Sequence, residues 1–111
     1  MKLIYICTPL KGEKFLLDKI QKALLAEDVF GFIPPTGQLN SKKLGAELDR
    51  KMISLCDELW AFGLLGRDCA WEVGYATGLG KKVRIFKTKE NQELIDNDWM
   101  TVIGAEIIEL E

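Results

Sequence analysis

Apolar and polar positions along the chain fall into two alternating patterns. Short apolar runs rich in β-branched and aromatic residues predict five strands, at residues 3–7, 29–33, 59–62, 82–86 and 105–110. Apolar residues at helical spacing predict amphipathic helices at 13–26, at 41–55 and from 68 to about 78, with Ser41 and Asp68 as N-caps. Residues 89–99 carry a weaker pattern, typical of a short helix or a loop.

Strands that alternate with helices indicate a parallel sheet covered on both faces. Right-handed crossovers then predict an α/β, flavodoxin-like (Rossmann-like) three-layer sandwich with a five-stranded parallel sheet in the order 2-1-3-4-5. The length of 111 residues predicts a single domain, residues 1–111. Ligands of such sheets bind beyond the carboxyl ends of the strands, at the switch point between the first and third strands. Residues 8–12 and 63–72 are expected at that edge.

The composition excludes several kinds of chemistry. The sequence contains no histidine, which rules out Ser-His-Asp and Cys-His catalysis and histidine-ligated zinc. A net charge of −2 leaves no basic face for a nucleic-acid polymer. No apolar run is long enough to span a membrane. The three cysteines form no CxxC pair and indicate reduced thiols in a cytoplasmic protein. We expect no metal and no cofactor.

Glu72 is the first candidate for chemistry. If Asp68 caps the third helix, Glu72 lies four residues later on the same side, near the mouth of the sheet. The small residues Ala70, Val73, Gly74 and Thr77 would then pack on the strands. A carboxylate near a helix N-terminus is stabilised in its charged form by roughly 0.3–1 kcal/mol, which suits a nucleophile. The alternative is a solvated glutamate on an exposed helix face.

Other candidates also have a plainer interpretation. Asp49 is either a functional acid or one half of a surface ion pair. The loop at residues 8–12 leads from a strand into a helix and carries Lys11, so it is either a weak anion site or an ordinary turn. Cys69 lacks a histidine partner and is interpreted as structural.

Three segments together resemble a known family. They are residues 4–12 (IYICTPLKG), the spacing from Asp49 to Asp57, and residues 71–76 (WEVGYA) followed by 80–83 (GKKV). This set resembles the nucleoside 2-deoxyribosyltransferase-like superfamily, which includes the 2′-deoxynucleoside 5′-phosphate N-hydrolases. The resemblance implies a flavodoxin-like fold and cleavage of the N-glycosidic bond of deoxynucleosides.

The resemblance also implies roles for individual residues. Glu72 would be the nucleophile that attacks the anomeric carbon, and Asp49 would contact the substrate and help to protonate the departing base. Residues that would line the sugar and a 5′-phosphate are Tyr5, Thr8, Pro9, Lys11 and Gly12. Gly66 stands where relatives often carry Asp or Ser to hold the sugar, and Asp68 follows two positions later. Pro9 replaces the hydroxyl residue of the nucleotide hydrolases.

Three functions remain open. The first is an enzyme that cleaves or transfers the N-glycosidic bond of a nucleoside or nucleoside 5′-monophosphate, a reaction that needs no metal or cofactor. The second is a nucleotide-binding module without turnover, which Gly66 favours. The third is an oligomeric scaffold, in which Glu72 would pair with a lysine or face solvent. A short sheet with exposed edges also predicts a homo-oligomer.

Overall fold

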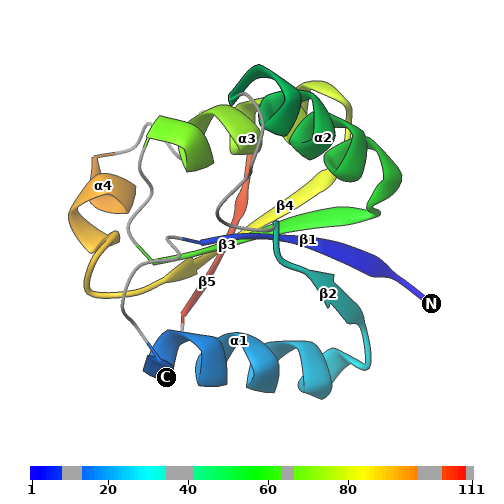
Figure 1. Ribbon diagram of the computed structural model, residues 1–111. Coiled ribbons are helices and arrows are strands. Elements are labelled where there is room, and N and C mark those ends of the chain that lie inside the picture. The colour runs from blue at the N-terminus through cyan, green and yellow to red at the C-terminus, as the bar shows by residue number, and fades with distance from the viewer. Residues whose placement is uncertain (9–13, 35–41, 64–66, 98–103, 110–111) are drawn as a thin grey trace.

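The computed structural model describes residues 1–8, 14–34, 42–63, 67–97 and 104–109, without the side chains of residues 14–16, 42 and 67. Strands and helices alternate along it (Figure 1). The strands are β1 (Leu3–Cys7), β2 (Phe30–Phe32), β3 (Glu58–Phe62), β4 (Lys82–Lys87) and β5 (Glu106–Glu109). The helices are α1 (Lys14–Glu27), α2 (Lys42–Leu55), α3 (Arg67–Gly78) and α4 (Gln92–Asp96).

The five strands form one parallel sheet in the order β2-β1-β3-β4-β5. Figure 1 shows α1 on one face of this sheet and α2 and α3 on the other. This is the α/β flavodoxin-like arrangement that the sequence predicts, and that prediction is confirmed. None of the helices in the described residues is long and apolar enough to cross a membrane.

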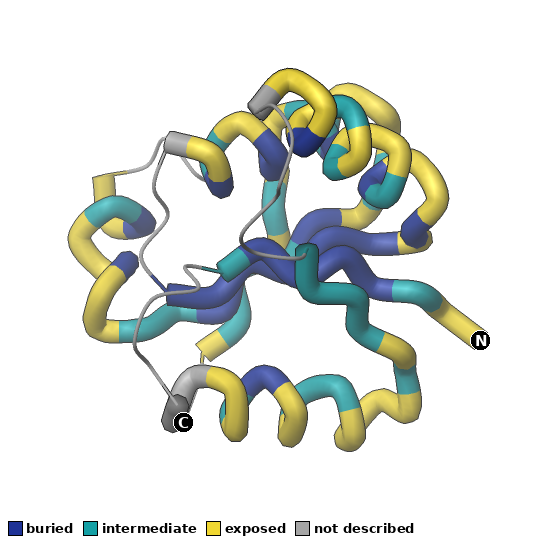
Figure 2. Tube along the Cα trace, viewed as in Figure 1, coloured by how far each residue is buried: buried dark blue, intermediate teal, exposed yellow. Residues whose placement is uncertain are grey.

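The core of the described residues consists of two clusters, one on each side of the sheet. Figure 2 shows the central strands of the sheet as the most buried layer. Successive side chains of a strand point to opposite faces. In β1, Ile4 and Ile6 therefore pack in the cluster that contains Ile20 of α1. Tyr5 and Cys7 pack in the other cluster, with residues of α2 and α3. The alternation thus directs a phenol and a thiol toward the two helices that carry the candidate acids.

The segment with the weak pattern takes one of its two predicted forms, whereas the bounds of the second and third strands differ from the prediction. The weak pattern at 89–99 contains a short helix, α4, which the buried side chain of Asn91 fixes to the sheet. Its Nδ2 donates hydrogen bonds to the carbonyls of Gly63 and Phe86, and its Oδ1 accepts one from the Thr88 amide. The second strand is shorter than predicted, three residues in place of five, and the third begins one residue earlier, at Glu58.

Candidate active site

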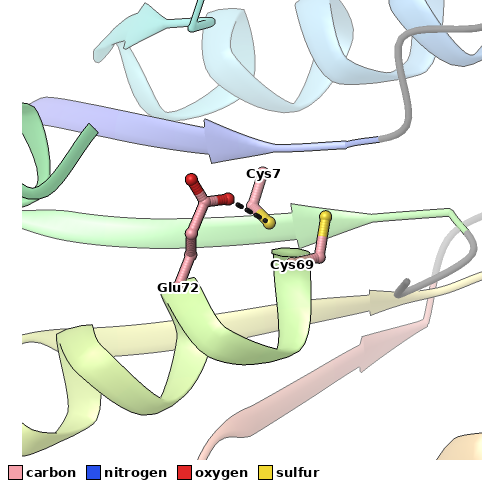
Figure 3. A group of neighbouring side chains, drawn as sticks. All are labelled: Cys7, Cys69 and Glu72. Atoms are coloured by element: carbon pink, nitrogen blue, oxygen red, sulfur yellow. Dashed lines mark hydrogen bonds between the residues drawn. The ribbon is translucent and has the colours of Figure 1, made fainter. Parts of the chain in front are cut away.

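Glu72 extends from α3 toward the sheet and is 8% exposed. Its Oε2 accepts a hydrogen bond from the Tyr5 hydroxyl at 2.6 Å. Its Oε1 accepts one from the Cys7 thiol at 3.2 Å, which Figure 3 shows. Both donors come from β1, next to β3 at the centre of the sheet. The alternatives of a solvated or solvent-facing glutamate are therefore wrong, and the ion pairs found among the described residues do not include a lysine pair of Glu72.

The orientation of α3 differs from the prediction. The residues of α3 that face the core are Cys69, Glu72, Val73 and Ala76. Of the predicted small-residue face, Val73 is buried, Ala70 and Thr77 are half-buried and Gly74 is exposed, so the packing face is rotated away from the prediction toward Glu72. The helix begins at Arg67, which places Asp68 inside its first turn rather than at the N-cap, and its side chain is exposed. The buried face of α3 can contain the carboxylate of Glu72 because Tyr5 and Cys7 of β1 donate hydrogen bonds to it.

The electrostatic surroundings of Glu72 oppose its ionisation. Burial raises the pKa of Glu72, and the charges of Asp49 and Asp68 raise it further. The hydrogen bonds from Tyr5 and Cys7 act in the opposite direction but do not compensate. The expected stabilisation of the charged form by the helix N-terminus is therefore outweighed. Burial and the contact with Glu72 also raise the pKa of Tyr5, which keeps its hydroxyl proton available as a donor.

Asp49 is half-buried on α2, and burial and the charge of Asp68 raise its pKa. Its Oδ1 is buried and has no hydrogen-bond partner within the described part of the chain. The ion pairs found among the described residues do not include Asp49, so the predicted surface ion pair is not among them. A buried oxygen without a partner is unfavourable by about 1–3 kcal/mol unless a ligand or water contacts it.

Asp57, the second acid of the motif spacing, has a structural contact. Its carboxylate accepts a hydrogen bond from the Leu3 amide at 2.8 Å, and its own amide donates to the Leu3 carbonyl at 2.8 Å. These bonds join the start of β1 to the chain entering β3.

The predicted site residues are therefore brought together in part. Tyr5 contacts Glu72, while the charges of Asp49 and Asp68 act on it. Thr8 follows the last residue of β1, and its Oγ1 is buried without a partner among the described residues. Outside the described residues lie Pro9, Lys11, Gly12 and Gly66.

Sequence reasoning missed the contribution of Cys7. It lies two residues after Tyr5, so strand alternation places both side chains on one face of β1. Cys69 lies one turn before Glu72 on α3 and belongs to the same buried group. The Cys69 contact and burial raise the pKa of Cys7, which keeps the thiol neutral.

A hollow of about 520 Å³ lies beside α2 and α3, away from these groups. Its lining residues are Glu47, Arg50, Lys51, Ser54, Leu55 and Tyr75. Neither Asp49 nor Glu72 contributes to it.

Solved structures of similar fold were found, whereas no family model and no curated protein matches the sequence. A 2-deoxyribosyltransferase from Leishmania mexicana is 25% identical, with a TM-score of 0.64 over 80% of this chain and 66% of that one. A CMP N-glycosidase from Clostridium botulinum is 21% identical, with a TM-score of 0.65 over 97% and 88%. A 2-deoxyribosyltransferase from Bacillus psychrosaccharolyticus is 23% identical, with a TM-score of 0.64 over 98% of both chains.

The chain spans just under two thirds of the Leishmania protein and nearly all of the Bacillus one. All three neighbours share its fold, and they are enzymes of the group indicated by the motifs. The resemblance of this chain to the nucleoside 2-deoxyribosyltransferase-like superfamily is thus confirmed by its structure.

Proposed function

We propose that this protein cleaves or transfers the N-glycosidic bond of a nucleoside, or of a nucleoside 5′-monophosphate, with Glu72 as the nucleophile. The observation that carries the proposal is a buried carboxylate held by two neutral donors of β1. Glu72 is buried with no cationic hydrogen-bond partner among the described residues, an arrangement unfavourable for the fold that supports a functional role for it. The fold neighbours, which include transferases and a glycosidase, support the reaction class.

In the proposed reaction, a Glu72 oxygen forms a bond to the anomeric carbon as the bond from that carbon to the base nitrogen breaks. The Tyr5 hydroxyl keeps its bond to Oε2. Oε1, whose partner is the weaker thiol donor, is the oxygen more easily released for attack. Water, or the nitrogen of a second base, then attacks the anomeric carbon and releases Glu72.

Asp49 is proposed as the general acid. Its raised pKa favours the protonated form, which can give its proton to the departing base. In the second step the resulting carboxylate takes a proton from the attacking water or base, which restores the starting state. The buried Oδ1 of Asp49 has room for such a hydrogen bond because no described residue contacts it through one.

The remaining predicted residues are proposed to bind substrate. Tyr5 would contact the sugar from β1, and Thr8 would meet it with its unpartnered hydroxyl. The loop residues Pro9, Lys11 and Gly12 would surround the sugar and a 5′-phosphate, together with Gly66 and Asp68. Neither metal nor cofactor takes part in these steps.

The test is an incubation of the protein with deoxy- and ribonucleosides and their 5′-monophosphates, with and without an acceptor base. Chromatography would detect free base and exchanged nucleoside. We expect turnover with the wild-type chain and a loss of about 10³-fold or more in Glu72→Gln. Glu93→Gln, an exposed glutamate of α4, is the matched control and should keep wild-type turnover.

Equal turnover by Glu72→Gln and the wild type would remove the assignment of the nucleophile. Binding of a nucleotide by the wild-type chain with no base released over hours would instead identify a binding module on the same fold.

We also propose that the chain forms a homo-oligomer through the outer side of α2 and α3. Leu48 and Leu55 lie two turns apart on α2 and are 43% and 70% exposed. On α3, Trp71 is 48% exposed and stacks on Tyr75. Light scattering should give a mass above that of one chain, and Leu48→Glu should reduce it to one chain. A monomeric wild-type protein would contradict this proposal.

A further inference from the structure

Two cysteines and a glutamate meet at the centre of the molecule, although no metal ligand was expected from the sequence. Cys7 at the end of β1, Cys69 in the first turn of α3 and Glu72 each offer one ligand atom, and these atoms all lie within 4.8 Å of one another. Figure 3 shows the three side chains converging between β1 and α3. They are 1%, 8% and 8% exposed.

We infer that these three residues form a binding site for one soft divalent cation, of the Zn²⁺ or Cd²⁺ class. Two thiolates with one carboxylate favour such an ion over Mg²⁺ or Ca²⁺, which prefer oxygen ligands. A tetrahedral zinc ion with bonds of about 2.0–2.3 Å separates its ligand atoms by about 3.3–3.8 Å. Bringing the present atoms to that spacing needs side-chain shifts of about 1 Å.

The hydrogen bonds of Glu72 favour this geometry. Tyr5 holds Oε2, which leaves Oε1 toward the Cys7 sulfur at 3.2 Å. A donor that fixes one carboxylate oxygen while the other coordinates the ion is the common arrangement around metal ligands. Ion binding would replace the Cys7–Glu72 hydrogen bond and release both thiol protons to solvent.

Three protein ligands leave one position of a tetrahedral ion open to water or to a small anion. An ion at this site would also occupy the carboxylate proposed as nucleophile. The cation is therefore expected to inhibit the proposed reaction reversibly, and a chelator should restore it. The binding itself does not depend on that reaction.

The test is a titration with Cd²⁺ under reducing conditions, followed by the ultraviolet charge-transfer absorption that thiolate–cadmium bonds produce. We expect the band to saturate at one equivalent in the wild type. Cys69→Ala should lose about 100-fold or more in affinity, since even partners outside the ligand set are worth 10–100-fold. Cys56→Ala is the matched control, since Cys56 is also buried but lies outside the group.

Two further variants separate ligation from folding. Glu72→Gln should keep the thiolate band but weaken binding by at least about 10-fold, and Tyr5→Phe should weaken it by about 10-fold. Far-ultraviolet circular dichroism verifies the fold of each variant. A wild-type chain without the band, or a folded Cys69→Ala chain with wild-type affinity, would overturn the inference. A wild-type chain that binds cadmium as expected but releases no base from any nucleoside would contradict the proposed function and leave the cation site supported.

Discussion

Glu58 and Glu72 are both buried glutamates, 4% and 8% exposed, yet their surroundings are opposite. Glu58 lies in β3 on the face that packs against α1. Its Oε2 accepts a hydrogen bond from the Lys2 ammonium at 2.9 Å, and its Oε1 accepts one from the Trp60 indole at 3.0 Å. The Arg84 guanidinium lies 3.7 Å away and stacks over the ring of Trp60. Burial opposes ionisation, but these partners outweigh it and lower the pKa of Glu58.

Glu72 belongs to α3, on the opposite side of the sheet, and has no cation among its hydrogen-bond partners in the described residues. Tyr5 and Cys7 are neutral donors, and Asp49 raises the pKa of Glu72 further whenever its own carboxyl is ionised. The charge of Glu58 is therefore balanced by cations and a donor, whereas the charged form of Glu72 is destabilised by its surroundings. Glu72, unlike Glu58, therefore gains stabilisation when it bonds to a substrate carbon or to a metal ion.

The largest expected effect concerns the acid found beside Glu72 and not beside Glu58. Asp49→Asn removes the proposed proton donor but keeps the shape of the side chain. We expect the rate of base release to fall by roughly 10²–10⁴-fold, as for other general acids. The control is Asp18→Asn, which removes the same charge from an exposed position of α1. A wild-type rate in Asp49→Asn would show that the leaving base receives its proton elsewhere.

Glu58→Gln is expected to give the largest change in stability. The amide still accepts from Trp60 but loses the charge that Lys2 and Arg84 contact. We expect a decrease of roughly 1–3 kcal/mol in the free energy of unfolding at neutral pH, measured with urea. The lowered pKa of Glu58 means that this stabilisation is present above its ordinary value of 4.5 and is lost as the pH falls through the folded-state pKa.

Its control is Glu106→Gln, whose carboxylate also lies 3.7 Å from Arg84 but is half-exposed. That variant should change stability by less than about 1 kcal/mol. Equal losses in the two variants would mean that burial does not distinguish Glu58.

Glu72→Gln should change stability in the opposite direction, by a gain of about 0.5–2 kcal/mol at neutral pH. The folded-state pKa of Glu72 is raised, so stability is fully present below the unfolded value of 4.5 and is lost as the pH rises through the folded-state pKa. The variant escapes that loss, and its advantage should vanish in acid. Urea unfolding at several pH values measures this, and a destabilised variant at neutral pH would contradict it.

The fold was predictable because its signals are local. Apolar runs marked all five strands, and their alternation with helices restricted the sheet to one order. The burial of Glu72 was not predictable from the helix pattern, which treats a glutamate as a solvent-facing residue. The donors that permit this burial, Tyr5 and Cys7, are 67 and 65 positions away in the sequence. Helical periodicity does not register a partner at that distance.

The same reason explains the error in the face of α3. Small residues predicted close packing, and Val73 does pack in the core, yet Gly74 is exposed. The true packing face contains one acid whose polar atoms are satisfied by another element. For Asn91, the three hydrogen bonds that fix α4 to the ends of β3 and β4 are likewise visible only after the sheet is formed.

Tyr5→Phe is the smallest and sharpest change. In the wild type, the hydrogen bond from Tyr5 to Glu72 Oε2 lowers the pKa of that carboxyl. The substitution removes this bond and leaves the aromatic packing in β1 unchanged. A hydroxyl binds the charged carboxylate more strongly than the neutral acid, so the pKa of Glu72 should rise further. The rising limb of the pH–rate profile should move to higher pH, and the plateau rate should fall by about 3–10-fold. Tyr75→Phe, on the outer side of α3, is the control. An unshifted profile in Tyr5→Phe would mean that the reactive group is not the carboxyl that Tyr5 holds, and Glu72 would then be a buried acid whose strain serves no reaction.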